Sequence, residues 1–365
     1  MRDAIPISTV QPGGNTVRAA VLRAFKQPLE WQEVATPSPE PDEVLVQVMA
    51  CGIDGTDLKL LDGFGYTPDL PFIMGHEVAG VVTEAGYRVT GFEEGDRVIA
   101  YNFTTCGDCL PCRTYREQIC VNMGGVLGAK DRHGGYSEFV AIPGRQLVHA
   151  PEQVSWPDSA VCCDAGMTAF HAIDRAGLRV GETVLIVGVG GVGSIAVQLA
   201  KAAGARVLAV ELSKAKREWA RQLGADELLD PEEGDIAVEV RALTNGQGVD
   251  CVIDIVGHTE TMGVGIESLR NGGRLVIVGY TPDHYPVEGK YLAQNELEII
   301  GTRAGRKQDL IEVSRLMASG KIRSIVTQTF PMENANEALA VLRSGENLGR
   351  IVLLTPAGRR AVDTT

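Results

Sequence analysis

The sequence predicts an α/β protein that combines a β-rich, barrel-like half with a doubly wound parallel sheet. Short β-rich runs broken by Gly, Pro and Asp fill the first part of the chain, and from about residue 160 strands alternate with helices. The chain has 365 residues, which is too long for one small hydrophobic core and favours about two domains.

The β-rich half begins with short runs interrupted by the proline-rich stretch 36–41. Each predicted strand ends at Gly, Pro or Asp, as expected for strands joined by tight turns. Short strands in this arrangement favour a compact antiparallel barrel. The predicted strands are VRAAVLR at 17–23, DEVLVQVMACGI at 42–53, VAGVVTEAG at 78–86, DRVIAY at 96–101 and GGYSEFVAI at 134–142.

The second half changes to alternating helices and strands, which predicts a parallel sheet. Segment 159–177 predicts a helix, and segment 183–205 predicts a buried strand, a glycine-rich turn and a long helix. Further strands are predicted at 206–212, 249–257, 273–280 and 349–354, and further helices at 214–225, 309–320 and 333–345.

Composition and charge argue against several classes of partner. The chain carries 34 basic and 47 acidic residues, a net charge of −13, so neither nucleic acid nor an anionic membrane is an expected partner. No run of about 18 apolar residues predicts a transmembrane helix. Residues 1–16 lack the basic start and apolar core of a secretory signal, and we expect a flexible extension there. These features predict a cytoplasmic protein with reduced thiols.

Four cysteines lie within residues 106–120 in the pattern C-x2-C-x2-C-x7-C. Two C-x-x-C steps let a short turn bring thiolates around one ion, and the fourth cysteine completes a tetrahedron. A zinc ion with four sulfur ligands has no open position, so this site would be structural rather than catalytic. Disulfide pairing is the alternative, and a reducing compartment favours zinc. The predicted ligands are Cys106, Cys109, Cys112 and Cys120.

A glycine-rich turn predicts a dinucleotide site. Gly188, Gly190 and Gly193 form G-x-G-x-x-G between a predicted strand and a predicted helix, with Gly191 and Val192 inside the turn. The first Gly permits the tight turn, the second lets the backbone approach a pyrophosphate, and the third brings helix and strand together. The helix N-terminus then presents amide N–H groups to the anion.

The residue after the next predicted strand favours NAD over NADP as the dinucleotide. Glu211 lies eighteen residues past Gly193. A carboxylate there accepts hydrogen bonds from the ribose hydroxyls and repels a 2′-phosphate. Lys214, Lys216 and Arg217 follow and could soften that preference, although a solvated helix face is the simpler interpretation.

Together, the cysteine loop, the glycine turn and Gly75-His76-Glu77 resemble the zinc-dependent medium-chain alcohol and polyol dehydrogenases. The resemblance extends over about residues 17–355 and keeps the order of the family's motifs. Besides these motifs, it rests on CGIDGTDLK, GHEVAGVVTEAG, GDRVIA, DAGMTAFHAI and GRIVL.

The family's fold implies a GroES-like catalytic barrel at 17–160, with the zinc loop at 106–120, and an inserted NAD-binding Rossmann domain at 161–300. Residues 301–365 would return to the catalytic domain and end in a C-terminal tail. The resemblance also implies reversible hydride transfer between NAD and a secondary alcohol, polyol or sugar, in a dimer or tetramer.

A second, catalytic zinc ion is implied by the same resemblance. Its first ligand, normally Cys, falls on Asp54, and Cys51 is the nearby alternative. The second ligand falls on His76 and the third on Asp164, while Glu77 is the neighbour that approaches the metal when water is displaced. Two carboxylates in place of thiolates predict a weaker, more exchangeable zinc and some tolerance for other divalent cations.

Three further residues receive roles from the resemblance. Thr56 lies where the family places the hydroxyl that takes the substrate proton. Relatives often have His three residues later, where this chain has Lys59, so either Lys59 or water would end the proton relay. Arg350 matches the arginine that pairs with the dinucleotide pyrophosphate, and a guanidinium suits that anion.

Two other functions stay open. A zinc-free quinone or enoyl reductase uses the same scaffold, but such enzymes usually lack both the cysteine loop and the Gly-His-Glu motif. A non-catalytic nucleotide-binding role is disfavoured because Thr56, His76 and Asp164 are all present. The predicted activity is therefore that of an NAD- and zinc-dependent dehydrogenase acting on a small alcohol or carbonyl compound.

Overall fold

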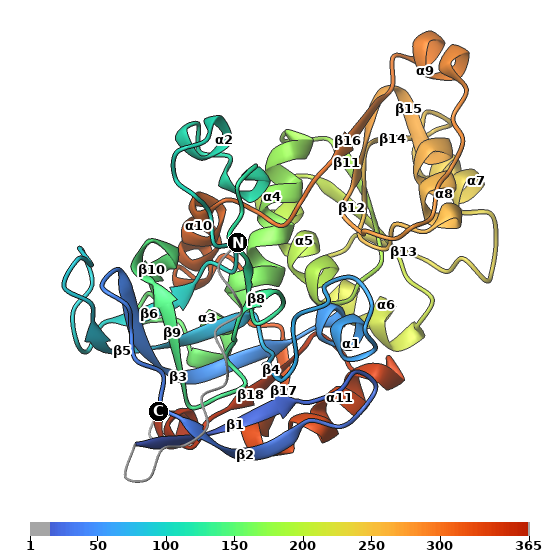
Figure 1. The fold of residues 1–365 in the computed structure, drawn as a ribbon. Coiled ribbons are helices and arrows are strands. Elements are labelled where there is room, and N and C mark those ends of the chain that lie inside the picture. The colour runs from blue at the N-terminus through green and yellow to red at the C-terminus, as the bar shows by residue number, and fades with distance from the viewer. Residues whose placement is uncertain (1–14, 364–365) are drawn as a thin grey trace. The chain divides into compact units, whose positions relative to one another are not determined.

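The computed structural model describes residues 15–363, which divide into two compact units (Figure 1). The extension expected at 1–16 falls on residues 1–14, which lie outside the described residues, and strand β1 already begins at Thr16. Among the described residues, unit 1 comprises those up to Asp164, Arg306–Ser319 and those from Ser324 onward, and unit 2 comprises Ala165–Gly305 and Gly320–Arg323.

Unit 1 is built on a seven-stranded sheet that joins the two ends of the chain. Its strand order is β10-β6-β5-β3-β18-β17, with β9 on β3, and all neighbours are antiparallel except β17 and β18. Because β18 pairs with β3, the C-terminal segment completes the sheet. The strands are β3 Glu43–Ile53, β5 Glu77–Ala85, β6 Arg97–Ala100, β9 Phe139–Pro143, β10 Leu147–His149, β17 Val326–Pro331 and β18 Arg350–Leu354.

Smaller elements complete unit 1. A three-stranded sheet has the order β2-β1-β4, and β7 pairs with β8. These strands are β1 Thr16–Leu22, β2 Glu30–Ala35, β4 Phe72–Ile73, β7 Val126–Leu127 and β8 Asp131–Arg132. The helices are α1 Gly55–Leu61, α2 Leu110–Arg113, α3 Trp156–Val161, α10 Lys307–Ala318, α11 Ala335–Ser344 and α12 Pro356–Asp363, with 3-10 turns at Glu117–Ile119, Gly144–Gln146 and Met332–Asn334.

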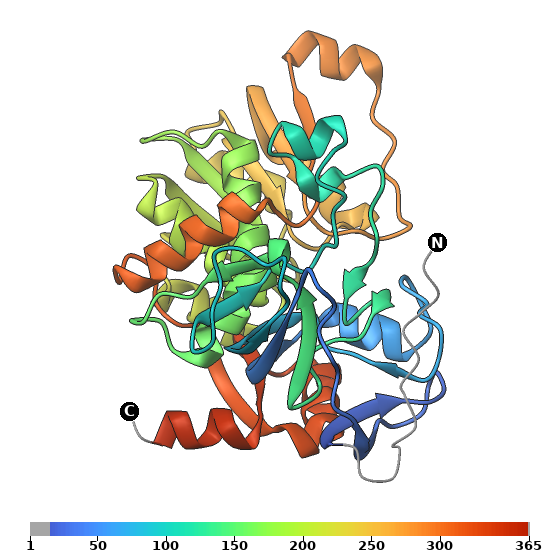
Figure 2. The same ribbon diagram turned by 60° about the vertical axis from the view of Figure 1, so that its left-hand side comes forward.

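Unit 2 contains a six-stranded, fully parallel sheet of order β13-β12-β11-β14-β15-β16 (Figure 2). Its central strands β11, β12 and β14 are rich in Val, Ile and Leu and almost entirely buried, as expected for a parallel sheet covered by helices, whereas the edge strand β16 is largely exposed. The strands are β11 Thr183–Val187, β12 Arg206–Val210, β13 Glu227–Leu229, β14 Val249–Asp254, β15 Leu269–Ile277 and β16 Glu298–Gly301. The helices are α4 Met167–Ala176, α5 Gly191–Ala202, α6 Lys214–Gln222, α7 Ile236–Leu243, α8 Thr259–Ser268 and α9 Gly289–Asn295.

The glycine turn of unit 2 follows β11, the strand at which the strand order of the sheet reverses. Strand β11 lies between β12 and β14, so successive connections leave it toward opposite edges. In doubly wound sheets, ligands bind beyond the carboxyl ends of the strands at this switch point. The predicted fold class is confirmed.

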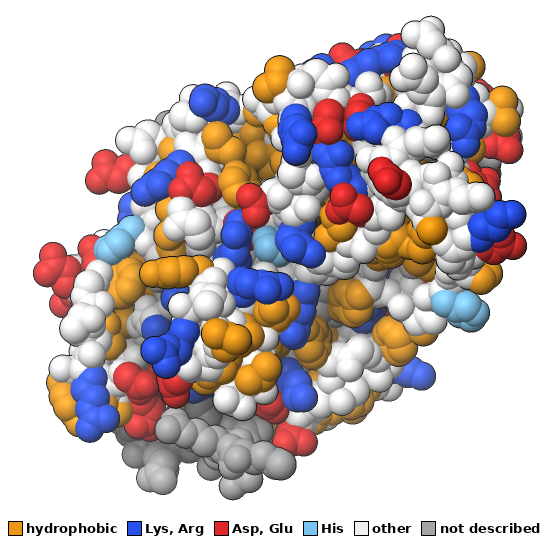
Figure 3. Space-filling model, turned by 90° about the horizontal axis from the view of Figure 1, so that it is seen from above, with side chains coloured by type: hydrophobic (Ala, Val, Ile, Leu, Met, Phe, Trp, Pro, Cys, Tyr) orange, Lys and Arg blue, Asp and Glu red, His pale blue; other side chains and the backbone are white. Residues whose placement is uncertain are grey.

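Two surface properties bear on possible partners. Acidic, basic and apolar side chains are interspersed on the face seen in Figure 3, so the net charge of −13 does not form one patch there. Among residues 15–363, no helix is both long enough and apolar enough to cross a membrane.

Candidate active site and zinc-binding loop

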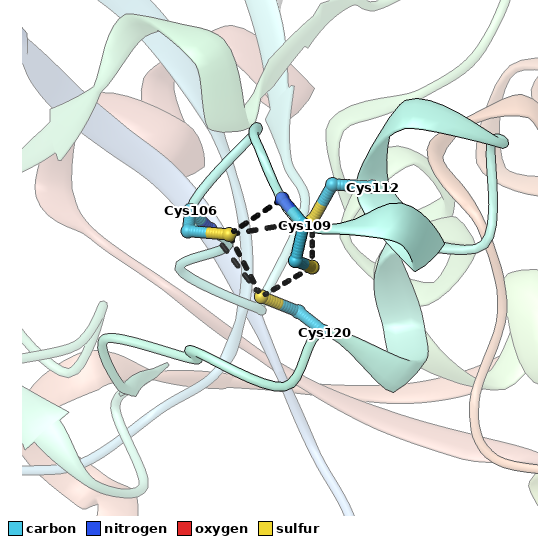
Figure 4. Close-up of side chains that lie close together, drawn as sticks. All are labelled: Cys106, Cys109, Cys112 and Cys120. Atoms are coloured by element: carbon cyan, nitrogen blue, oxygen red, sulfur yellow. Dashed lines mark hydrogen bonds between the residues drawn. The ribbon is translucent and has the colours of Figure 1, made fainter.

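The four cysteines of the 106–120 loop converge on one point (Figure 4). The Sγ atom of Cys109 lies 3.4 Å from that of Cys112 and 3.8 Å from that of Cys120. The Sγ atoms of Cys106 and Cys120 are 3.5 Å apart. Thiolates about 2.3 Å from a tetrahedral zinc are ~3.8 Å from one another, whereas the sulfurs of a disulfide are about 2.0 Å apart. The geometry therefore fits one zinc ion, and all four cysteines are free thiols.

Backbone amides of the loop support the thiolate form of these cysteines. The N–H of Cys109 donates to Sγ of Cys106 at 3.4 Å, and the N–H of Cys106 donates to Sγ of Cys120 at 3.4 Å. The backbone N–H of Cys112 lowers the pKa of Cys109 to about 6. Zinc binds the deprotonated sulfur, so these bonds favour metal binding by Cys106 and Cys109, whereas burial raises the pKa of Cys112 to about 12 and also raises that of Cys120.

Asp54 is the N-cap of helix α1, and its carboxylate lies close both to the first turn of this helix and to His76. As the N-cap it accepts the N–H of Thr56 at 2.7 Å, and Asp57 in return accepts the N–H of Asp54 at 3.0 Å. This capping box explains an aspartate at the position without any metal. The Asp54 carboxylate also reaches His76, because its Oδ1 lies 3.6 Å from the Nε2 of that ring.

His76 is held between two carboxylates. Its Nε2 faces Asp54, and its buried Nδ1 lies 3.6 Å from Oδ1 of Asp57. Only 3% of His76 is exposed. The preceding Gly75 has φ +96°, and a Cβ there would lie 2.3 Å from the ring of Tyr136. Glycine is therefore required before the histidine, which accounts for the first letter of the Gly-His-Glu motif.

Glu77 and Arg350 form a buried ion pair beside the histidine. The guanidinium of Arg350 contacts the Glu77 carboxylate and donates to the carbonyl of Ile53 at 2.9 Å. Gly52 faces Glu77 across the β3–β5 ladder, and a Cβ at Gly52 would lie 1.8 Å from the carboxylate. Arg350 is 4% exposed, so it is not a surface charge. Its pairing with a pyrophosphate stays a prediction.

Asp164 reaches the cluster from an irregular helix. The single helix expected at 159–177 consists of α3, a π-helical turn at Cys162–Gly166, and α4. Single-turn π segments are frequent at functional sites. Asp164 lies in this turn, and its Oδ1 accepts a hydrogen bond from the side-chain amide of Asn102 at 3.3 Å. Asn102, a residue that received no role from the sequence, is thus a neighbour of Asp164.

The structure brings four of the predicted metal ligands together. One ligand atom from each lies within 4.8 Å of the others, the set being Asp54, His76, Glu77 and Asp164. Oxygen and nitrogen ligands about 2.0–2.2 Å from a tetrahedral zinc lie ~3.4 Å apart, close to the 3.6 Å between Asp54 and His76. The donor set therefore fits a divalent cation after small side-chain shifts.

The electrostatics of the cluster also favour a cation. Burial raises the pKa of Glu77 to about 8, and burial together with the charge of Asp54 raises that of Asp164. Burial alone would lower the pKa of His76, but the carboxylates of Asp54 and Asp57 raise it well above its usual value. These groups thus hold protons tightly, and a divalent cation would take the place of those protons.

Cys51, the alternative first ligand, does not belong to this cluster. Its buried Sγ packs against the backbone of two glycines, where Cβ atoms built at Gly75 and Gly135 would approach it to 2.8 Å and 3.1 Å. Burial raises its pKa well above the usual thiol value. This placement favours Asp54 as the ligand.

The remaining predicted residues of unit 1 lie on helix α1. The hydroxyl of Thr56 is 3.4 Å from Oδ2 of Asp54 and can donate to it. Lys59 follows one turn later and is half-buried. Their roles in proton transfer stay predictions.

In unit 2 the glycine turn has the predicted conformation. Gly188 has φ +90°, and a Cβ on Gly193 would lie 2.0 Å from the Gly188 carbonyl, so both positions require glycine. A Cβ at Gly190 would meet nothing within 4 Å, which leaves room for a ligand against the backbone. Helix α5 begins at Gly191, next to Val192. These are the features of a pyrophosphate cradle.

Glu211 is hydrogen-bonded to the glycine turn. Its Oε2 accepts the N–H of Val189 at 2.9 Å, and its Oε1 accepts the N–H of Ser213 at 3.1 Å. The carboxylate is thus oriented by two backbone amides at the carboxyl end of β12. Its contact with a ribose stays a prediction.

Comparison with known proteins agrees with this geometry. Residues 40–152 match the family model of the alcohol dehydrogenase GroES-like domain, and residues 191–319 match that of zinc-binding dehydrogenases. An alcohol dehydrogenase of Geobacillus stearothermophilus is 36% identical over 339 residues, covering 92% of this chain and 99% of the relative. An NAD-dependent alcohol dehydrogenase of Saccharolobus solfataricus is 31% identical over 348 residues, covering 93% and 100%.

Two further matches are a relative named for a different activity and a solved structure with bound metal. An acryloyl-coenzyme A reductase of Metallosphaera sedula is 33% identical over 343 residues, covering 93% of this chain and 100% of the relative. The solved structure of a cobalt- and zinc-bound thermostable alcohol dehydrogenase from Pyrobaculum aerophilum is similar with a TM-score of 0.85 and 32% identity, covering 93% and 100%. These matches confirm the family expected from the motifs. The chain is an enzyme of the zinc-binding alcohol dehydrogenase family, with a GroES-like domain and a Rossmann-type domain.

Proposed function

We propose that the protein catalyses reversible hydride transfer between an alcohol and NAD, with one catalytic and one structural zinc ion. The observation that carries the proposal is the convergence of Asp54, His76 and Asp164 beside Glu77, in a chain that also has a pyrophosphate cradle. The NAD-dependent relative from Saccharolobus solfataricus supports the choice of cofactor.

In this proposal Asp54, His76 and Asp164 hold the catalytic zinc. When bound, the ion acts as a Lewis acid that stabilises the substrate oxygen as an alkoxide during oxidation and polarises the carbonyl during reduction. The Asp57 carboxylate, 3.6 Å from Nδ1 of His76, would attract that side of the ring and leave Nε2 for the metal. Glu77 is buried and paired with Arg350. It lies close enough to these three residues that it could replace one of them as a metal ligand.

Thr56 would move the substrate proton. Its hydroxyl can accept that proton from the alcohol while donating its own to a neighbouring acceptor. In the described structure the neighbour is Oδ2 of Asp54 at 3.4 Å, which orients the hydroxyl. Lys59 or a water molecule would end the relay.

The glycine turn would bind the pyrophosphate of NAD and Glu211 its adenosine ribose. The carboxylate can accept both ribose hydroxyls, and its charge opposes a 2′-phosphate. Arg350 would add a positive charge toward the pyrophosphate, a role supported by its buried Nε atom, which has no hydrogen-bond partner among the described residues.

Replacing Glu211 with alanine is expected to narrow the preference for NAD over NADP by about tenfold or more, because a phosphate-repelling charge and two acceptors are lost. The preference is measured as the ratio of kcat/KM for the two coenzymes. Glu218→Gln is the matched control, since Glu218 is an exposed residue of α6 paired with Arg221 at 3.6 Å. An unchanged ratio in Glu211→Ala would show that the carboxylate does not contact the ribose.

Replacing Asp54 with cysteine is expected to tighten zinc binding at the catalytic site by about tenfold or more, because thiolate is the softer ligand. Competition against a chromophoric chelator measures the affinity. The variant also loses the N-cap of α1, which costs about 1 kcal/mol of stability, so its unfolding is followed in parallel. Cys51→Ser is the control and should leave the affinity unchanged; the opposite pattern would make Cys51 the ligand.

A substrate panel tests the function directly. Secondary alcohols, polyols and aldoses are offered with NAD, and NADH absorbance is followed with and without a chelator. We expect oxidation of at least one alcohol and its loss on chelation. The Metallosphaera sedula relative favours a second candidate, reduction of a carbon–carbon double bond conjugated to a thioester, so acryloyl-coenzyme A is included with NADH and NADPH. Chelator-insensitive reduction of this compound, without alcohol oxidation, would replace the proposed function.

Assembly and location belong to the same proposal. We expect a dimer or tetramer, tested by light scattering of the zinc-loaded enzyme. The cytoplasm is the proposed compartment, since the four zinc-ligating cysteines must stay reduced to bind the ion.

A further inference from the structure

Arg217 is held by three acceptors next to Glu211. It lies in the first turns of α6, and its Nη1 donates to the carbonyls of Glu211 at 2.7 Å and Leu212 at 2.6 Å. Its Nη2 lies 2.5 Å from Oδ2 of Asp230. The Arg217 and Asp230 side chains are only 14% and 11% exposed. This is the best-shielded of the ion pairs that lie around α6, since Glu218 and Arg221 are about 60% exposed.

Asp230 is itself fixed at the carboxyl end of the sheet. It directly follows β13, and its Oδ1 accepts the N–H of Glu232 at 3.0 Å. The N–H of Glu211 donates to the carbonyl of Leu229 at 3.2 Å, which joins the ends of β12 and β13. The Arg217–Asp230 pair thus lies at the same sheet edge as the Glu211 carboxylate.

A guanidinium in this place is the natural partner of a ribose 2′-phosphate. Arginine recognises phosphate through two parallel N–H bonds and a fixed charge. Here the Asp230 carboxylate neutralises that charge, and both terminal nitrogens already donate to protein acceptors. The guanidinium of Arg217, which has the chemistry to bind a phosphate, is therefore already engaged by protein acceptors.

We propose that Asp230 is a specificity-determining residue, which by pairing with Arg217 keeps this guanidinium from recognising the 2′-phosphate of NADP. Two separate effects then favour NAD over NADP. Glu211 repels the phosphate, and Asp230 withholds the cation that would attract it. This inference rests on the proposed use of a dinucleotide, although it concerns residues that play no part in hydride transfer.

If both effects operate, substitutions of Glu211 and Asp230 should not have independent effects on 2′-phosphate binding. Binding of adenosine 2′,5′-bisphosphate and of AMP to the zinc-loaded enzyme is measured by calorimetry, which requires neither a substrate nor the catalytic metal. Glu211→Ala alone should improve bisphosphate binding relative to AMP by about tenfold, in line with its effect on the two coenzymes, whereas Asp230→Asn alone should improve it only modestly. The double variant should improve it about tenfold beyond the product of the single effects. Asp230→Asn keeps the size of the side chain and its Oδ1 acceptor, so folding should be preserved.

Two further variants identify the cause of that gain. Adding Arg217→Gln to the double variant should abolish it, because the phosphate would lose its partner. Glu227→Gln removes an equal charge from β13, where Glu227 pairs with Arg206 at 3.1 Å, and should change the ratio less than about twofold.

The outcomes separate this inference from the proposed function. Strictly additive effects of Glu211→Ala and Asp230→Asn, or a gain that survives Arg217→Gln, would overturn the role of Asp230 while nucleotide binding itself stands. Failure of the unmodified enzyme to bind AMP and NADH would overturn the dinucleotide site, and this inference with it.

Discussion

Replacing His76 with alanine is expected to lower kcat/KM for alcohol oxidation by at least about a thousandfold and to remove one of the two bound zinc ions. His76 is the one nitrogen ligand among the three proposed, and it is buried between Asp54 and Asp57. Without it, three neighbouring carboxylates must hold the ion, or protonate if they cannot. Zinc content and kcat/KM are measured on the same preparation.

The matched control for this substitution is His149→Ala. His149 is an exposed residue at the end of β10, and its Nε2 contacts the carbonyl of Gly91 at 3.0 Å. Zinc content and kcat/KM should stay within about twofold of the unmodified enzyme. If His76→Ala retained both zinc ions and its activity, the metal would have to be bound elsewhere.

Replacing Cys112 with alanine is expected to remove the other zinc ion and to lower the Tm by about 10 °C. A zinc ion would constrain the 106–120 loop, and in the variant the three remaining cysteines would leave it one ligand short and bind it too weakly to retain it. We expect the loop to open and become sensitive to limited proteolysis. The readouts are zinc content, the Tm and the position of the first proteolytic cuts.

Cys251→Ala serves as the control for Cys112→Ala. Cys251 is a fully buried residue of β14, and its thiol donates weakly to the carbonyl of Val252 at 3.7 Å. The substitution should cost some stability through lost packing but leave the zinc content unchanged. A Cys112→Ala protein that kept its zinc content, its Tm and its resistance to proteolysis would refute a structural zinc in this loop.

The features that sequence predicts best are local in the chain. The four cysteines and the glycine turn each lie within a few residues, so their spacing alone determines which atoms can meet. The alternation of strands and helices likewise predicted the parallel sheet of unit 2. These predictions depend on neighbours along the chain and not on the packing of distant segments.

The parts that were missed depend on register and long-range packing. Gly52 makes room for Glu77 only because β3 and β5 pair in one particular register. The burial of Arg350 on Glu77 follows from pairing of β18 with β3. The π-helical turn that carries Asp164 differs from an α-helix in having i→i+5 rather than i→i+4 hydrogen bonds, a local change that hydrophobic periodicity does not resolve.

The choice between Asp54 and Cys51 shows the same limit. The two residues are three positions apart, and either could be the ligand by spacing alone. Cys51 is the last but two residue of β3 and faces Gly75 and Gly135, whereas Asp54 begins α1 and faces His76. The boundary between strand and helix decides which side chain reaches the cluster.

The most direct test measures zinc content and activity on the same sample while the enzyme is dialysed against a series of chelators of increasing strength. We expect two zinc ions per chain at saturation, one in the cysteine loop and one at Asp54, His76 and Asp164. The ion at Asp54, His76 and Asp164 should leave first and take the activity with it, while the ion of the cysteine loop stays in a folded, inactive protein. A single zinc ion per chain, with alcohol oxidation that no chelator reduces, would contradict the catalytic metal site.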